Sequence, residues 1–152
     1  MNKSPINHIA TIAIGVVLWV VFGILMASVL SESPNLKDKD ATVLAGELRF
    51  IFGVGVLICL VCCSYWYYYG SRESTAGELP SAKRKWRMLF FFQVVLAIAL
   101  TVVIILMNMS QEMEAKWFVI YFGLISVLTF ILFWAATFVM SPRTVKFVPF
   151  GK

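Results

Sequence analysis

Charged residues are scarce in this sequence, and four long stretches contain none at all. Asp, Glu, Lys and Arg make up only 14% of the 152 residues, whereas hydrophobic residues make up 61%. Ionisable side chains within a membrane mark proton paths, ion sites and substrate pockets. Their absence from these stretches argues against a proton-driven pump and against a self-sufficient secondary transporter.

Histidine and cysteine are also rare, which limits metal and haem chemistry. The single histidine, His8, cannot supply a bis-histidine haem site alone, and a zinc site needs about four ligands. Cys59, Cys62 and Cys63 lie within an apolar stretch, whereas a redox C-x-x-C generally lies at a helix N-terminus. We interpret the cysteines as small packing residues. We expect no cofactor, no metal site and no catalytic site, so the chain is predicted not to be an enzyme.

The four uncharged stretches are each long enough to cross a bilayer. They comprise Ile9–Leu30, Phe50–Tyr69, Met88–Met109 and Trp117–Met140. A helix of about 20 residues spans the hydrocarbon core, and helix is the form expected because lipid offers the backbone no hydrogen-bond partner. Asp40 is a suitable N-cap, so the second helix is expected to begin before the membrane. The sequence predicts a single all-α membrane domain over residues 1–152, with four transmembrane helices in two antiparallel hairpins.

Basic residues are divided unevenly between the two ends of these helices. One end has nine, namely Lys3, Arg72, Lys83, Arg84, Lys85, Arg87, Arg143, Lys146 and Lys152. The other end has four, namely Lys37, Lys39, Arg49 and Lys116. Cytoplasmic loops of membrane proteins carry the excess of Lys and Arg. Both termini, the loop 70–87 and the tail 141–152 are therefore predicted to lie on the cytoplasmic side of the inner (plasma) membrane.

The densest basic segment comprises Lys83, Arg84, Lys85 and Arg87, which we place in the loop 70–87. Besides setting the topology, these residues are expected to attract anionic lipid headgroups, by about 1 kcal/mol for each residue near the surface. A nucleic-acid partner is not expected, because the chain has no soluble domain that could present a basic surface.

Small residues recur at helical spacing in the first two stretches. Gly55, Cys59 and Cys63 follow one another every four residues, and Gly23 and Ala27 form a shorter version. Such stripes let transmembrane helices approach closely. They are predicted to be helix–helix interfaces, and the stretch that contains Cys59 is expected to face another helix.

Gln93 is the most notable polar residue within the uncharged stretches, about a turn and a half into the third. Its amide could bond to a partner helix or line a pore. The alternative, which we favour, is an amide near the membrane surface that bonds to a neighbouring backbone.

The tail that follows Met140 has an extended pattern, because Pro142 and Pro149 exclude a long helix. Its candidate partner-binding residues are Arg143, Lys146, Phe147 and Phe150. The tail could add a strand to the sheet of a partner protein. Equally, its phenylalanines could dip into the membrane interface.

Together these features favour a non-catalytic scaffold subunit of a larger inner-membrane complex, such as a secretion or conjugation apparatus or a multisubunit transporter. Its expected partners are the lipid bilayer and other membrane subunits, identical or different, and no small-molecule substrate is evident. Two alternatives remain open. One is a homo-oligomeric pore or holin-like channel, and the other is an immunity-type membrane protein that binds a toxin.

Overall fold

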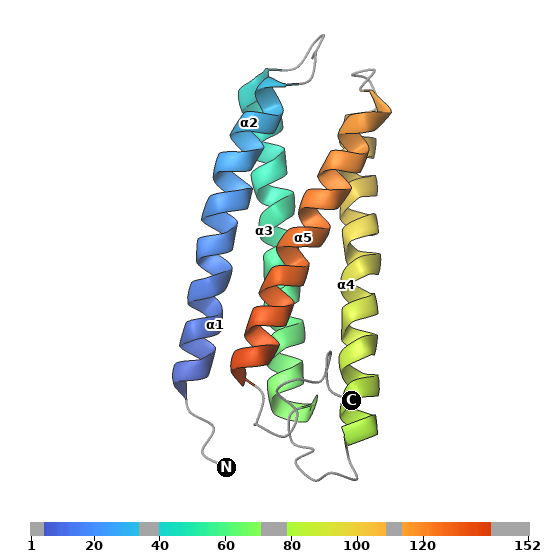
Figure 1. The fold of residues 1–152 in the computed structure, drawn as a ribbon. Helices are drawn as coiled ribbons and strands as arrows, with labels where there is room; N and C mark the ends of the chain where they lie inside the picture. Colours follow the sequence, from blue (N-terminus) through green and yellow to red (C-terminus); the bar gives the residue numbers. More distant parts are fainter. Residues whose placement is uncertain (1–4, 34–39, 71–78, 109–113, 141–152) are drawn as a thin grey trace.

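The computed structural model of the chain describes residues 5–33, 40–70, 79–108 and 114–140. Within this described part, four helical segments are long and apolar enough to cross a membrane. Consecutive segments run in opposite directions along one bundle, so that the first helix begins and the last helix ends at the same end of it (Figure 1). The predicted all-α membrane fold is confirmed.

The first segment is one continuous helical rod in three parts. These are α1 (Pro5–Leu18), the π-helix η1 (Trp19–Met26) and α2 (Ala27–Glu32). The indole of Trp19 lies between two glycines, Gly23 on its own rod and Gly53 on the next helix. A Cβ atom on Gly23 would lie 2.7 Å from Trp19 Cδ1, and one on Gly53 would lie 3.2 Å from Trp19 Nε1. Glycine at these two positions therefore makes room for the ring.

The second segment comprises α3 (Ala41–Tyr65) and the π-helix η2 (Trp66–Gly70). Asp40 precedes it with an extended backbone, and its carbonyl accepts a bond from Val43 N at 3.0 Å. Asp40 is thus the N-cap residue, as expected, although its side chain makes no capping bond. α3 begins nine residues before Phe50, so the second helix starts before the uncharged stretch, as expected, and includes Arg49.

The last two segments are α4 (Leu79–Met107) and α5 (Ala115–Met140). The prediction of a loop through Arg87 was wrong, because α4 already begins at Leu79 and therefore includes the whole basic segment. Pro80 lies in the first turn, where its missing N–H breaks no intrahelical bond, and Lys and Arg are good helix formers.

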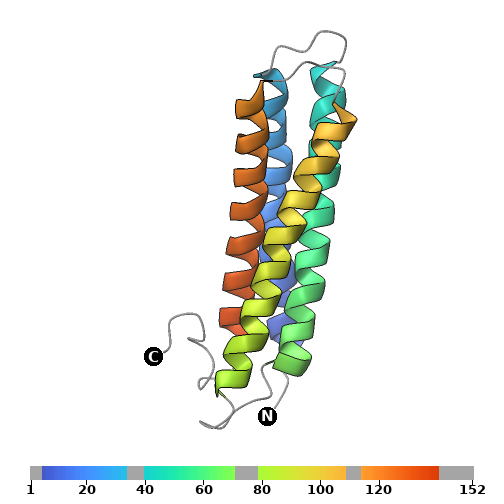
Figure 2. The same ribbon diagram turned by 90° about the vertical axis from the view of Figure 1, so that its right-hand side faces the viewer.

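The helices pack as two central and two flanking segments. α3 and α5 contact each other, and α1 and α4 each contact both of them. Figure 2 shows α4 crossing the bundle between α3 and α5. The buried core runs along all of these contacts and includes Phe52, Leu100, Ile104, Tyr121 and Leu132.

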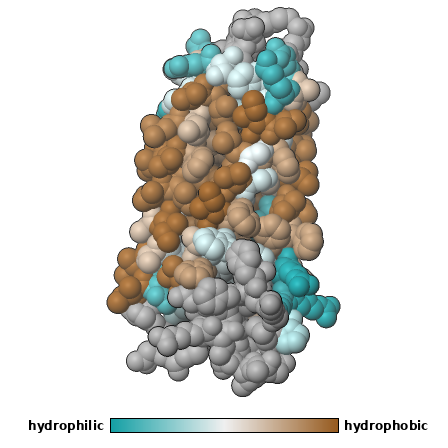
Figure 3. All heavy atoms as spheres, viewed as in Figure 1, coloured by the Kyte–Doolittle hydropathy of each residue, from teal (hydrophilic) through white to brown (hydrophobic). Residues whose placement is uncertain are grey.

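The face of the bundle seen in Figure 3 is mostly apolar over its middle, with hydrophilic residues gathered at both ends. Large apolar side chains point outwards from every segment, for example Phe50, Leu57 and Val61 on α3, with exposed fractions of 71%, 64% and 68%. A soluble protein rarely exposes so large an apolar surface. The chain is a multi-pass membrane protein.

Candidate functional site

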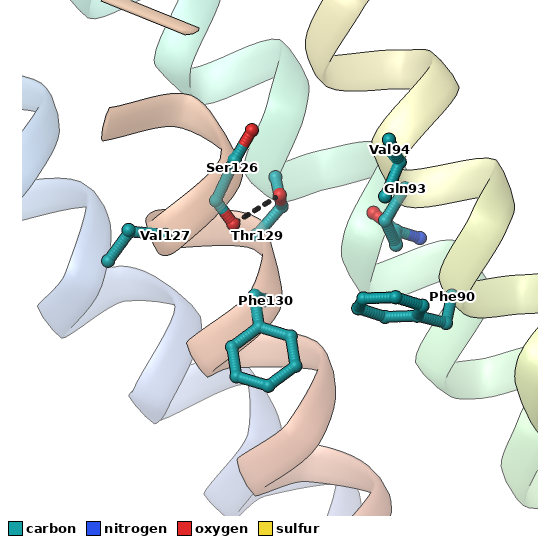
Figure 4. A pocket seen from close by; sticks show the side chains of 7 residues that line it. All are labelled: Phe90, Gln93, Val94, Ser126, Val127, Thr129 and Phe130. Carbon is teal, nitrogen blue, oxygen red and sulfur yellow. Dashed lines mark hydrogen bonds between the residues drawn. The ribbon is translucent and has the colours of Figure 1, made fainter. Parts of the chain in front are cut away.

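A pocket of about 260 Å³ lies between α4 and α5, partway along the bundle. Four hydrophobic and three polar residues line it (Figure 4). The lining residues are Phe90, Gln93, Val94, Ser126, Val127, Thr129 and Phe130. The pocket is open on one side, and the exposed side chains of Val127 and Phe130 place that opening on the apolar outer surface of the bundle.

Gln93 is the most unusual residue of this pocket. Only 2% of its surface is exposed, and neither Nε2 nor Oε1 has a hydrogen-bond partner among the described residues. The thiol of Cys62 on α3 lies near the amide, but outside hydrogen-bond geometry. The favoured interpretation, an amide bonded to a neighbouring backbone, is therefore wrong. Leaving an amide unpaired in an apolar surrounding costs about 1–3 kcal/mol.

Gln93 lies about a turn and a half into the uncharged stretch that begins at Met88. Because α4 begins at Leu79, this position is about four turns from the start of the helix. It is six residues beyond Arg87, which corresponds to about 9 Å of helical rise. Gln93 is thus well separated from the charged end of the helix.

Ser126 adds a second unpaired group. Its backbone carbonyl accepts a bond from Thr129 Oγ1 at 3.2 Å, which is the dashed line in Figure 4. Its side-chain Oγ is buried and has no partner among the described residues. An amide and a hydroxyl without a hydrogen-bond partner among the described residues are therefore buried behind the apolar surface of the pocket.

Other buried polar residues of the helices are paired differently. Thr101 donates to the Ala97 carbonyl at 2.8 Å, and Asn108 donates to the Ile104 carbonyl at 2.9 Å. Such bonds to the preceding turn satisfy a polar side chain without any partner helix. Gln93 and Ser126 differ from these two residues, as does Tyr121, whose buried OH also has no partner among the described residues.

The predicted small-residue stripe on α3 lies inside the bundle. Gly55, Cys59 and Cys63 are buried, and the Cys59 thiol lies 3.5 Å from the Thr129 carbonyl of α5. A Cβ atom on Gly55 would lie 3.1 Å from Leu100 Cδ1 of α4. The stripe therefore contacts helices of the same chain.

The shorter stripe on the first segment is likewise covered. Gly23 and Ala27 are both buried, in the part of the rod that packs against α3. That either stripe also touches a different protein stays a prediction, and the surface that such a protein could reach lies elsewhere.

The basic segment forms a second hollow, on the outer side of α4. Lys83, Arg84 and Arg87 line a groove of about 320 Å³, together with Pro80, Met88 and Phe91. Lys85 does not line it. This groove joins cationic side chains to exposed apolar ones.

Trp86, in the middle of the basic segment, points the other way. Its ring is buried, stacks on Phe90 with 5.5 Å between ring centroids, and donates from Nε1 to Thr137 Oγ1 at 3.2 Å. The segment thus anchors α4 to α5 on one face while its charges lie on the other.

Arg49 lies within the helix that the N-cap signal at Asp40 predicted. No pattern in the sequence distinguishes Ser126 from the other hydroxyl residues of the uncharged stretches. The tail residues Arg143, Lys146, Phe147 and Phe150 lie outside the described residues.

Among the described residues, no three His, Cys, Asp or Glu side chains come together in a way that could hold a metal ion. The polar residues that line the pocket between α4 and α5 are neutral, and the surface that the pocket presents is almost entirely apolar.

Comparison with known proteins gives one partial similarity. No family model matches the chain, and no solved structure matches it. Phospho-N-acetylmuramoyl-pentapeptide-transferases of Rhodococcus opacus (strain B4) and Rhodococcus jostii (strain RHA1) are each 30% identical to it over 77 residues. The match covers 51% of this chain but only 20% of either transferase. The similarity therefore concerns about a fifth of those enzymes.

Proposed function

We propose that this protein is a non-catalytic scaffold subunit of a larger assembly in the inner (plasma) membrane. The observation that supports it is the wide apolar outer surface of the helices, on which Phe50, Leu57 and Val61 of α3 are 71%, 64% and 68% exposed. Transmembrane helices of other proteins can pack against such a surface. The pocket between α4 and α5 presents almost only apolar surface, so the outer faces of the helices are the surfaces through which the chain can act.

The proposed orientation places both termini and the basic segment in the cytoplasm, where Lys and Arg of short loops accumulate. Single cysteines at position 84 and position 116 would test it, because the native cysteines are buried. An impermeant thiol reagent should label Lys116→Cys in intact cells. It should label Arg84→Cys only after the membrane has been permeabilised, and the reverse pattern would exclude this orientation.

The subunit role is tested by isolating the protein under mild conditions. A tag on the N-terminus leaves the tail free, and the protein is extracted from its native membrane in a gentle detergent. Quantitative mass spectrometry should then find one or more larger membrane proteins in a fixed ratio to it. Recovery of a single species that forms a homo-oligomer would refute the subunit role and favour the pore, whose conductance in bilayers would then be measured.

The similarity to the transferases favours one other candidate, a membrane enzyme. The transferases are named for the transfer of phospho-N-acetylmuramoyl-pentapeptide, and the match includes half of this chain. We propose no such activity for it, since the pocket supplies neither an acid–base pair nor a metal site. Turnover of that substrate by the purified protein would overturn the non-catalytic assignment.

A further inference from the structure

We propose that the basic groove on α4 and the pocket between α4 and α5 are two halves of one binding site for an anionic phospholipid. The groove of Lys83, Arg84 and Arg87 holds the headgroup phosphate, and the pocket holds one acyl chain. This inference goes beyond the proposed subunit role and does not depend on it, because it concerns only surfaces of this chain.

The groove supplies the charge that an anionic headgroup requires. Arg84 and Arg87 are exposed on α4, and no carboxylate is among the described residues that line the groove. A guanidinium can donate two parallel hydrogen bonds to one phosphate group. The apolar part of the lining, Pro80, Met88 and Phe91, can contact the upper part of an acyl chain. The groove therefore fits the border between a headgroup and its chains.

The pocket selects an apolar occupant that needs no hydrogen bond. The surface that it presents is almost entirely apolar, because the amide of Gln93 and the hydroxyl of Ser126 are buried behind it. Its volume of about 260 Å³ exceeds that of an apolar cavity of about 150 Å³, which is large enough to bind benzene. The pocket therefore has room for several methylene groups, more than one aliphatic side chain of a partner helix contains.

The two hollows lie along one face of α4. Lys83 and Arg87 of the groove and Phe90 and Val94 of the pocket follow one another at spacings of four, three and four residues. Residues at these spacings share one side of an α-helix. The rings of Phe90 and Phe91, one from each hollow, lie 6.3 Å apart between centroids. The groove therefore leads to the pocket along this face.

The distance between the hollows agrees with the structure of a phospholipid. Gln93 lies about 9 Å of helical rise beyond Arg87. The polar layer on each side of a bilayer is about 5–8 Å thick, since the hydrocarbon core measures about 30 Å and the whole bilayer about 40–45 Å. A phosphate bound at the level of Arg87 therefore places hydrocarbon at the level of the pocket.

The opening of the pocket admits a chain from the outside of the bundle. Val127 and Phe130 of α5 border the opening and are 47% and 43% exposed. The ring of Phe130 meets that of Phe90 edge to face, with 5.6 Å between centroids, and Figure 4 shows both rings at the same end of the pocket. The two rings give an acyl chain an apolar wall to lie against.

The headgroup supplies the selectivity of this site. Within a bilayer an acyl chain gains no hydrophobic free energy by entering the pocket, because the chains that it leaves are as apolar as the pocket. The attraction between the phosphate and the basic residues is therefore what retains one lipid, and the pocket determines where its chain lies. An anionic lipid should occupy the pocket more often than a zwitterionic lipid with the same chains.

Photolabelling by lipid tests the inference on the purified full chain. The protein is reconstituted into phosphatidylcholine vesicles that contain a small fraction of phosphatidylglycerol with a photoreactive group in one acyl chain. We expect mass spectrometry to find the label mainly on the pocket residues Val94 and Val127, and much less on Leu57, which is 64% exposed on α3. When phosphatidylcholine carries the photoreactive chain instead, the pocket residues should be labelled no more than Leu57.

Changes in the groove link the headgroup to the chain. Arg87→Ala should lower the labelling of Val127 by about five-fold, and Arg84→Ala combined with Arg87→Ala should lower it by about thirty-fold. Lys85→Ala is the matched control, because it removes one charge from the same segment outside the groove. It should leave the labelling of Val127 unchanged.

A change at the rim shows that the chain lies in the pocket. Val127→Trp places a large side chain at the opening and should abolish the labelling of Val94. Val95→Trp is the matched control, because Val95 is 61% exposed on α4 and does not line the pocket. Both positions are on the outer surface, so neither change should alter the helical content measured by circular dichroism.

Four other outcomes would each overturn the inference. These are equal labelling of Val127 and Leu57, equal labelling of the pocket by the two lipids, and labelling that Arg87→Ala does not lower. The fourth is displacement of the lipid by inorganic phosphate, which would mean that the groove binds a free anion. None of them bears on the subunit role, because the vesicles contain no partner protein.

Discussion

The Arg49 guanidinium donates a hydrogen bond to the Ser28 hydroxyl, with 2.8 Å between Nη2 and Oγ. Ser28 in turn donates to the Ile24 carbonyl at 2.9 Å, and Trp19 Nε1 donates to the Arg49 carbonyl at 3.3 Å. Arg49 thus joins α3 to the first segment through both its side chain and its backbone. A residue that appears to belong to a loop is part of a helix–helix contact.

Replacing Arg49 should weaken this contact. We expect Arg49→Leu to lower the free energy of unfolding by about 1 kcal/mol, since a bond to a charged donor is lost while the unpaired Nε is removed at the same time. Titration with a denaturing detergent, followed by circular dichroism, measures the change. Lys116→Met is the control, because Lys116 is 60% exposed and its contacts, the ion pair with Glu114 and the approach to the Trp117 ring, lie at the surface. Equal effects of the two changes would refute a structural role of the Arg49 bond.

The bond between Trp86 and Thr137 should be measurable as an energetic coupling. Trp86→Phe keeps an aromatic ring for stacking on Phe90 but removes the donor, and Thr137→Val removes the acceptor. A double-mutant cycle should give a coupling of about 0.6 kcal/mol, with an upper limit of about 1.7 kcal/mol, as for other hydrogen bonds within membrane proteins. Strict additivity of the two single changes would show that this bond contributes nothing to stability.

Two glycines should respond in opposite ways to the same substitution. Gly46→Ala places a methyl group where no atom lies within 4 Å, so it should stabilise α3 by up to about 1 kcal/mol through helix propensity. Gly23→Ala places one 2.7 Å from Trp19 Cδ1, so the indole must move, and we expect a loss of about 1–3 kcal/mol. Unfolding midpoints of both variants would check this. If Gly23→Ala is as stable as the original chain, the slot for Trp19 is not tightly packed.

The basic groove on α4 should bind anionic lipid. Replacing Arg84 and Arg87 together by Ala should reduce the anionic phospholipid retained by the purified protein by about thirty-fold, at about 1 kcal/mol for each residue. Native mass spectrometry after incubation with phosphatidylglycerol gives the amount retained. Lys85→Ala removes a charge from the same segment without touching the groove, so it should have little effect. A loss that depends only on the number of charges removed would refute a defined site.

The fold of the chain is readable from the sequence because its signals are local. The length of an uncharged stretch and the need of the backbone for internal hydrogen bonds are enough to predict the spans. The ends of the helices were predicted less accurately than the spans. A helix continues beyond the uncharged stretch where residues such as Lys83 and Arg87 favour helix. The polar residues that precede Met88 were predicted to lie in a loop, and part of them lies in α4.

The sites were much harder to predict. Lipid is as apolar as the packed interior, so a helix in a membrane need not be amphipathic, and its inward face leaves little trace in the sequence. Gly55 and Cys59 carried such a trace in their spacing, and they are buried. No such spacing distinguishes Gln93 from Thr101 in the sequence. Yet the Thr101 hydroxyl bonds to a carbonyl of its own helix, whereas the Gln93 amide has no partner among the described residues.

What the sequence alone determined is therefore that this chain crosses a membrane as helices, because that follows from the composition of each stretch taken by itself. The tertiary structure decided which polar groups find a partner. Whether Gln93 is paired depends on the atoms that α3 and α5 bring to within about 3 Å of its amide. No property of the segment around Gln93 contains that information, since the atoms belong to residues more than thirty positions away.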